Sequence, residues 1–341
     1  MGEDVPRDSE FGLPDRLTNE HGAIRMLGFE LEFAGLELDD IARVVMGLFG
    51  GVHYADSHFQ HRVADTRWGD FVIEIDAALL KDRAYIGYLQ RIGFDLDQGW
   101  QRRLDEVLAR IAGTVVPHEI ATPPIPMTEA GCIEELRAAL RSRHAQGTRA
   151  SPLYAFGMHF NPEAPALHVE TLTAYLRAYL ILEDWLKQRS QVAITRQIVP
   201  FINDFPEDYV RHVVDPDYRP SLRRLMADYL YHNPTRNRPL DMLPLFGHLD
   251  PDWLFARLPE DTLVRTRPTF HYRLPNCAVD EPGWRVAREW HGWLEVEQLA
   301  NDPASLGALG RRFLKWHRET LSGTDERWAD EIRRWQVETG R

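Results

Sequence analysis

The sequence predicts an α+β fold in which helices cover a mostly antiparallel sheet. Two observations support this prediction. Short segments that alternate strictly between apolar and polar residues recur along the chain, and longer segments with helical spacing of apolar residues lie among them. The order of these segments lacks the regular strand-helix-strand alternation that is typical of parallel sheets, so antiparallel pairing is favoured.

Alternation of apolar and polar side chains predicts strands at 28–33, 68–77 and 154–161, and residues 52–64 are expected to form one or two more. Shorter strands are expected at 115–120 and 263–274, and prolines follow each of them. Apolar residues at helical spacing predict helices at 38–49, 97–112, 128–144 and 171–187. The polar, proline-containing region 204–220 shows neither pattern. From residue 284 onward the chain is helical in pattern and rich in tryptophan, which indicates packing.

Composition excludes several classes of protein. The chain has 341 residues, 44% hydrophobic and 27% charged, with a net charge of −12. Such an acidic protein binds nucleic acid and anionic membranes poorly. No apolar stretch is long enough to span a bilayer, and the first 20 residues lack the apolar core of a signal peptide, so a cytoplasmic protein is expected. The two cysteines are too few for a disulfide framework.

Three regions are expected along the chain. Residues 1–20 are polar and read as a flexible N-terminal tail. Residues 21–280 contain all the predicted strands and are expected to form one catalytic core. Residues 281–341 are expected to form a helical segment that packs on this core.

Ionisable residues gather on the polar faces of the predicted strands. The pairs Glu30/Glu32 and Glu74/Asp76 lie two residues apart, about 6.6–7 Å along a strand, and therefore point the same way. The same alternation places Glu119, His159, Asn161, His271 and Arg273 on polar faces. In one sheet these carboxylates would repel one another unless divalent cations lay between them, and carboxylates with imidazoles suit Mg²⁺ or Mn²⁺. The alternative is a solvated face without a ligand.

Five of these segments, in their order along the chain, resemble a known family. They are GFELEF (28–33), FVIEIDAAL (71–79), HEIATPP (118–124), GMHFN (157–161) and RPTFHYRLPN (267–276). They resemble successive strands of the amidoligase branch of the glutamine synthetase and γ-glutamylcysteine synthetase superfamily. The resemblance implies a glutamine synthetase-like core, a curved sheet with helices on its outer face. It also implies an ATP- and Mg²⁺-dependent carboxylate–amine ligase that forms an amide or isopeptide bond through an acyl phosphate.

The resemblance also implies metal ligands. Glu30 and Glu32 would each bind a different Mg²⁺; Glu119 would join Glu32, and His159 would join Glu30 at the ion that bridges the ATP phosphates. His271 stands where the family usually carries a glutamate, two residues before Arg273. A neutral imidazole there removes one negative charge, which favours Mn²⁺ or indicates an altered or lost activity.

Further residues are candidates for catalysis and cofactor binding. Asp76 and Glu74 are candidates to remove a proton from the attacking ammonium group, and Asp76 to position the substrate. Arg273 would face a phosphate or the substrate carboxylate. Candidate arginines for the nucleotide or substrate are Arg196, Arg236, Arg238 and Arg267, because arginine binds phosphate and carboxylate through two parallel hydrogen bonds.

Three functions remain open at the level of sequence. The first is the ligase, whose substrates would be a small molecule, amino acid or peptide with a carboxylate and a second molecule with an amine. The second is a metal-dependent hydrolase or phosphotransferase that uses the same carboxylates. The third is a catalytically inactive binding protein, suggested by His271. Nucleic-acid and membrane partners are not expected, and a homo-oligomer is left open.

Overall fold

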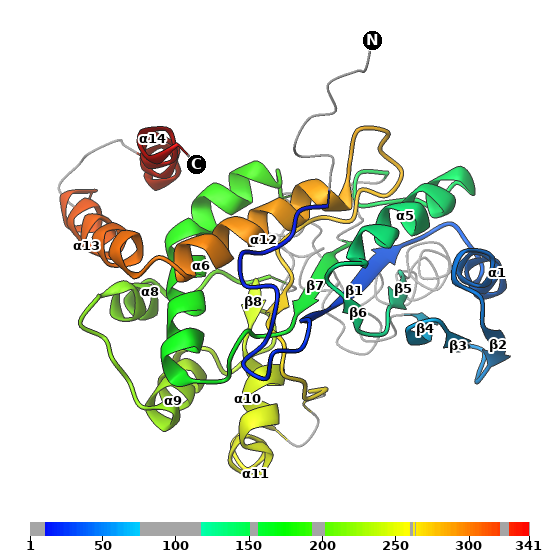
Figure 1. The fold of residues 1–341 in the computed structure, drawn as a ribbon, viewed down its shortest axis with the longest axis horizontal. Coiled ribbons are helices and arrows are strands. Elements are labelled where there is room, and N and C mark those ends of the chain that lie inside the picture. Colours follow the sequence, from blue (N-terminus) through cyan, green and yellow to red (C-terminus); the bar gives the residue numbers. More distant parts are fainter. Residues whose placement is uncertain are drawn as a thin grey trace, which may run out of the picture.

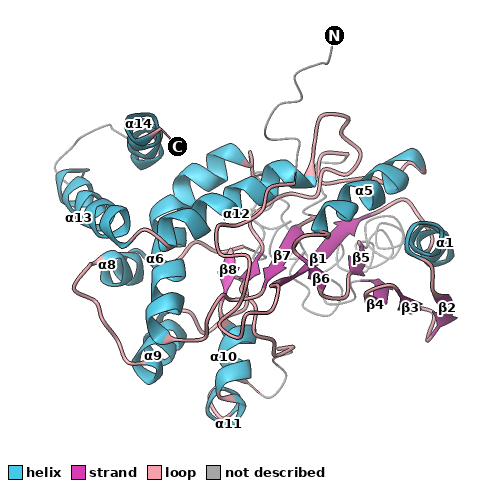
Figure 2. Ribbon diagram, in the orientation of Figure 1, coloured by secondary structure: helices cyan, strands magenta, loops and turns pink. Residues whose placement is uncertain are grey.

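The structure is a computed structural model, shown in Figure 1. It describes residues 11–75, 117–150, 156–192, 202–259, 262, 264–320 and 327–340. These residues form one large sheet with helices packed against it, as the colouring in Figure 2 shows.

The sheet contains nine strands in the order β2-β3-β4-β5-β1-β7-β9-β8, and β6 pairs with the start of β1. All of these pairings are antiparallel, which confirms the predicted sheet type. The strands are β1 (Met26–Phe33), β2 (Val52–Ala55), β3 (Gln60–Thr66), β4 (Gly69–Ile75), β5 (His118–Ala121), β6 (Ile125–Pro126), β7 (Met158–Pro162), β8 (Leu240–Asp241) and β9 (His271–Tyr272).

The two faces of the sheet differ in polarity, as the alternation predicts. On β1, Leu27, Phe29, Leu31 and Phe33 are completely buried, whereas the residues between them are partly accessible. On β4, Phe71 and Ile73 continue the same apolar face. Burial of this face stabilises the fold by about 25 cal/mol for each Å² of apolar surface removed from water, and it leaves the opposite face for polar side chains.

Helices from distant parts of the chain form a layer over the apolar face (Figure 1). Helix α1 (Leu38–Phe49) packs on β2, β3 and β4, and it contacts α5 (Ile133–Ser142). Helix α12 (Val286–Ala300) contacts both α5 and the long helix α6 (Val169–Arg189). The remaining helical elements are η2 (Ala130–Cys132), α8 (Glu207–Val214), α9 (Leu222–His232), α10 (Leu243–Leu249), α11 (Pro251–Phe255), α13 (Pro303–Thr320) and α14 (Trp328–Thr339).

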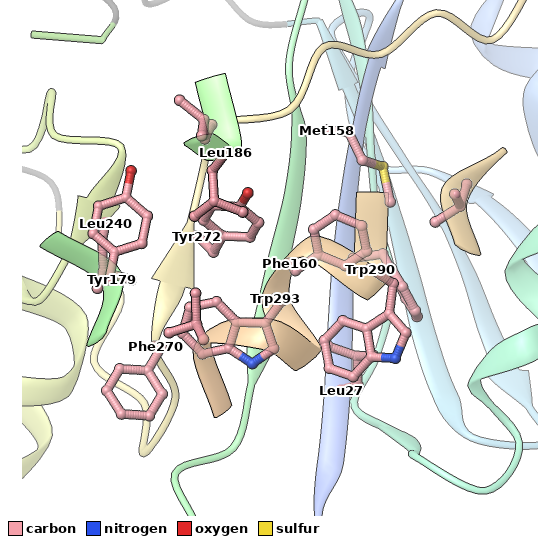
Figure 3. Close-up of a cluster of buried hydrophobic side chains, with 14 of the residues drawn as sticks. Leu27, Met158, Phe160, Tyr179, Leu186, Leu240, Phe270, Tyr272, Trp290 and Trp293 are labelled. Atoms are coloured by element: carbon pink, nitrogen blue, oxygen red, sulfur yellow. The ribbon is translucent and has the colours of Figure 1, made fainter. Parts of the chain in front are cut away.

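An aromatic cluster joins α12 to the middle of the sheet. Figure 3 shows the side chains of this cluster. The ring centroids of Trp290 and Phe160 lie 5.7 Å apart, and those of Trp293 and Tyr272 lie 5.3 Å apart. Phe11 stacks on Trp290 with a centroid distance of 5.6 Å, so residues near the N-terminal end of the described chain also pack on this core. The tryptophans of α12 therefore serve packing, as expected from the sequence.

A buried ion pair also joins α12 to the sheet. Arg25, directly before β1, contacts Glu297 of α12 at 2.7 Å, and both side chains are almost completely buried. Tyr175 and Trp293 donate further hydrogen bonds to the same carboxylate, at 3.2 and 2.8 Å. The carboxylate therefore has partners on three separate segments, and the ion pair fixes how the helical layer sits on β1.

Some elements differ from their predicted form. The late strand has only two residues, because Pro268 and Pro275 lack the N–H that a longer ladder needs. The region 204–220 contains α8, whose short apolar face went unrecognised. The helix predicted at 97–112 lies outside the described residues. Among the described helices, none combines the length and the apolar character needed to cross a lipid bilayer.

Candidate functional site

Three predicted site residues form a row across adjacent strands on the polar face. Glu32 of β1 lies directly opposite Glu119 of β5, and Glu119 lies directly opposite Glu74 of β4. Directly opposed residues in antiparallel strands have Cβ atoms about 4.5–5.5 Å apart, and like charges in such positions destabilise the sheet. We call Glu74, Glu119 and Glu32 the carboxylate row.

His159 lies beside this row and contacts two carboxylates. It is opposite Glu30 in the register of β1 and β7, and its Nδ1 lies 2.8 Å from a Glu30 oxygen. Its Nε2 lies 3.4 Å from a Glu32 oxygen. The backbone N–H of Gly157 donates to the other Glu32 oxygen at 2.6 Å. These contacts fix both carboxylates of the Glu-x-Glu pair, whose side chains keep about 15% of their surface accessible.

A second set of polar side chains surrounds Glu30 on its other side. One nitrogen of Arg267 donates to Glu30 at 3.0 Å and to Asn161 at 2.7 Å, and it lies 3.1 Å from Nδ1 of His271. Asn161 also donates to Glu30 at 3.0 Å, and its oxygen lies 2.7 Å from His271 Nδ1. Two residues that the sequence suggested as ligands, Glu30 and His271, thus belong to one network.

The surroundings of Glu30 favour its charged form, whereas those of His271 favour its neutral form. Burial disfavours the charged form of Glu30, but the neighbouring His271 and His159 imidazoles and the Arg267 guanidinium outweigh it and hold the Glu30 pKa well below its usual value. Burial likewise holds the pKa of His271 well below its usual value, and the Glu30 charge offsets only part of this effect. Glu30 is therefore an anion and His271 is neutral near pH 7, which are the states that bind metal.

The ligand atoms of Glu30, His159 and His271 lie within 4.8 Å of one another, which fits a shared metal ion. One carboxylate and two imidazoles suit Mn²⁺ and softer ions better than Mg²⁺, which prefers oxygen ligands. Oxygen ligands for a second ion are available from Glu32 and Glu119, which face each other. The Arg267 guanidinium forms an ion pair with Glu30. Its positive charge would therefore repel a metal ion that binds to Glu30.

Two of the other predicted arginines, Arg273 and Arg236, lie just after β9 and on the loop before β8. Arg273 donates to the backbone carbonyl of Arg236 at 2.6 Å, and Nε of Arg236 lies 3.5 Å from the buried carboxylate of Asp241. Burial raises the pKa of Asp241, although Arg236 and Arg273 partly offset this. Asp241 lies opposite His271 in the register of β8 and β9. This group therefore adjoins the network of His271 and Arg267.

Arg238 is placed differently from these arginines. Its guanidinium is nearly buried and donates to the side chain of Asn233 at 2.8 Å and to the carbonyl of Asn203 at 3.2 Å. In the structure it therefore joins loop segments to each other. Asp76 and Arg196 lie outside the described residues.

The alternation already places Asn161 on the same strand face as His159, whereas two other residues of the site were missed from the sequence. Arg265, whose Nη2 lies 3.7 Å from Glu74, lies two residues before Arg267. Asp241 sits in an apolar stretch and carried no signal, because only the pairing of β8 with β9 brings it to His271.

The comparisons with known proteins agree with the resemblance seen in the sequence. A family model described as a putative amidoligase enzyme matches residues 23–295. This match covers most of the chain, which therefore belongs to that family. The description is that of a ligase, an enzyme whose substrates carry a carboxylate and an amine. No curated protein and no solved structure gave a match.

Proposed function

We propose that the protein is an ATP- and divalent-metal-dependent carboxylate–amine ligase on a glutamine synthetase-like core. The observation that carries this proposal is the carboxylate row, which adjoins the Glu30–His159 pair in a chain of an amidoligase family. Carboxylates in directly opposed positions repel one another, and cations bound between them remove this repulsion.

In this proposal, Glu30, His159 and His271 hold one metal ion and Glu32 and Glu119 hold a second, with Mn²⁺ or Mg²⁺ as the ion. When bound, these cations offset the negative charge of ATP phosphates during phosphoryl transfer. The two imidazoles favour Mn²⁺ at the first of these sites.

The reaction activates the acid before the amine attacks. An oxygen of the substrate carboxylate bonds to the γ-phosphorus of ATP and ADP leaves. The amine nitrogen then bonds to the acyl carbon and phosphate leaves, so that one new amide or isopeptide bond is formed. The ammonium group must lose a proton in this second step, and a nearby carboxylate can accept it.

Glu74 is the described residue that best suits this proton transfer. It ends the carboxylate row, and its side chain is 27% exposed, more than those of Glu30 and Glu32. Asp76, two residues further on, remains the second candidate. Arg267 orients Glu30, Asn161 and His271 and can attract a phosphate or the substrate carboxylate. Arg273 and Arg236 are candidates for the same task, and Arg196 and Arg238 remain sequence-based candidates.

The test is an assay of the purified protein with ATP, Mn²⁺ or Mg²⁺, and pools of amino acids and peptides. We expect release of ADP and phosphate together with a product whose mass is the sum of an acid and an amine minus water. Glu32→Gln should abolish the product. Glu170→Gln, which changes an exposed carboxylate in the first turn of α6, should retain it. The ligase proposal fails if nucleotide does not bind in the presence of either metal.

The same assay separates the rival functions. A hydrolase or phosphotransferase would consume substrate without a new amide mass. An inactive binding protein, which His271 in place of the family's glutamate favours, would bind a ligand but release neither ADP nor phosphate.

A further inference from the structure

A second group of metal-ligating side chains lies at the outer edge of the sheet. His53 is on the edge strand β2, His61 is on β3, and Asp39 is in the first turn of α1. Nε2 of His53 lies 3.1 Å from Nδ1 of His61. Oδ1 of Asp39 lies 3.4 Å from this His61 nitrogen and 3.8 Å from the His53 nitrogen. We call these three residues the edge cluster.

The edge cluster lies on the opposite face of the sheet from the candidate active site. In the register of β3 and β4, His61 is opposite Ile73, which is completely buried, whereas the preceding residue, Gln60, is opposite Glu74. His61 therefore shares the face that α1 covers, and Glu74 shares the polar face. The two groups of residues cannot contribute to one site.

The distances in the edge cluster match those between ligands of one metal ion. For a triangle with sides of 3.1, 3.4 and 3.8 Å, the point equidistant from all three atoms lies about 2.0 Å from each. Zinc binds histidine nitrogen and carboxylate oxygen at about 2.0–2.2 Å. An ion at this point would lie almost in the plane of its three ligand atoms. Coordination sites above and below that plane would remain for water.

Hydrogen bonding alone satisfies these atoms poorly. Two imidazole nitrogens that face each other at 3.1 Å cannot both carry a proton, so at most one hydrogen bond joins them. The distances from Asp39 to the two rings are long for hydrogen bonds. A divalent cation between the three atoms would bind a lone pair from each of them.

We propose that Asp39, His53 and His61 bind a divalent transition-metal ion of the zinc type. Two imidazoles and one carboxylate select Zn²⁺, Co²⁺ or Ni²⁺ over Mg²⁺. The ion can enter from solvent, because the side chain of Asp39 is 65% exposed and that of His53 is 23% exposed. It would join the first turn of α1 to the hairpin of β2 and β3. It would so stabilise the edge of the sheet, where β2 has a neighbour on one side only among the strands that the structure describes.

The test measures zinc and cobalt binding to the metal-stripped full-length protein. Wild type should bind Zn²⁺ in the presence of excess Mg²⁺, and Co²⁺ should give visible absorption bands. His53→Gln and His61→Gln should each lower the zinc affinity of this site by at least about 100-fold, because even outer partners of metal ligands contribute 10- to 100-fold. The matched control is His58→Gln, an exposed histidine in the same hairpin.

Three further variants separate loss of the metal site from loss of folding. Asp39→Asn changes an exposed residue, so folding should be retained, and it should weaken zinc binding, whereas Asp40→Asn in the same helical turn should not. Glu30→Gln, at the candidate active site, should leave the zinc bound at the edge cluster in place. Thermal unfolding with and without zinc should show that zinc raises the melting temperature of wild type but not of His61→Gln. The proposal is wrong if metal-stripped wild type binds no zinc, or if both histidine variants keep the wild-type zinc stoichiometry and cobalt spectrum.

Discussion

Glu32 of β1 and Glu119 of β5 face each other directly across neighbouring strands, although they are far apart in the sequence. Both lie on the polar face of the sheet, opposite to the face on which the helical layer packs. This relationship is the structural basis for a cation-dependent site, because opposed carboxylates are tolerated best when a cation binds between them.

Arg267→Gln should tighten Mn²⁺ binding and lower ligase turnover. Removal of the guanidinium that contacts Glu30 at 3.0 Å takes a positive charge away from the proposed metal. At an effective dielectric constant near 20, a unit charge several ångströms away is worth more than about 1.4 kcal/mol, so affinity should rise by at least about tenfold. Titration of bound Mn²⁺ by electron paramagnetic resonance measures this change. Unchanged or weaker binding would contradict the placement of the ion beside Glu30.

His271→Glu should shift the metal preference from Mn²⁺ towards Mg²⁺. The substitution places an oxygen ligand and a negative charge where the buried, neutral imidazole now contacts Asn161 and Arg267. The ratio of ATP turnover with Mg²⁺ to that with Mn²⁺ should rise relative to wild type. His21→Glu, at an exposed position, is the control. If both variants keep the wild-type ratio, His271 does not contact the ion.

Arg25→Met should lower the free energy of unfolding by about 3–5 kcal/mol, because it leaves the buried Glu297 without its cation. The double variant Arg25→Met/Glu297→Met should recover part of this loss, since no buried charge remains unpaired. Urea unfolding monitored by circular dichroism measures both effects. Equal stability of the single variant and wild type would show that the pair does not hold α12 on β1.

Ionisation of Glu183 should lower the free energy of unfolding as pH rises. Burial raises the pKa of this carboxyl group to about 7 from its ordinary value near 4.5, although Lys187 lies 3.1 Å away. Between these two pH values the carboxyl group is protonated in the folded protein but ionised in the unfolded chain. The free energy of unfolding therefore falls as pH rises through this range. Relative to Glu183→Gln, wild type should lose up to about 3 kcal/mol between pH 4.5 and pH 8.

Urea titrations of wild type and Glu183→Gln at several pH values measure this difference. Lys187 stays charged throughout the range, because its pKa is raised further above its usual value. Glu170→Gln, which changes an exposed residue of the same helix, should follow the wild-type profile. Parallel profiles for wild type and Glu183→Gln would rule out ionisation of Glu183 as the cause.

Local patterns in the sequence predicted much of the fold. Helix α1 begins and ends at the predicted residues, and the alternation in β1 and β4 identified which side chains face the helices. These features depend on residues that are neighbours in the chain. Helix α8 was missed because its buried face consists of only Tyr209, Val213 and Val214 within eight residues, too few to establish a helical period.

Contacts between distant segments were harder to predict. Nothing local pairs Arg25 with Glu297 or brings Asp241 to His271, because both contacts exist only once the strands and helices have assembled. The proximity of Glu30 to His159, in contrast, was expected from the order of the family motifs together with the side-chain alternation. The sequence thus indicated which residues face the site, whereas only the structure showed which distant residues contact them.

The most direct test of the proposed ligase site is nucleotide binding with and without metal, measured by calorimetry for wild type, Glu32→Gln and Glu119→Gln. We expect wild type to bind ATP only when Mn²⁺ or Mg²⁺ is present, and both variants to lose this metal-dependent binding while remaining folded. Equal ATP affinity in the absence of metal, or in both variants, would contradict a cation site between Glu32 and Glu119.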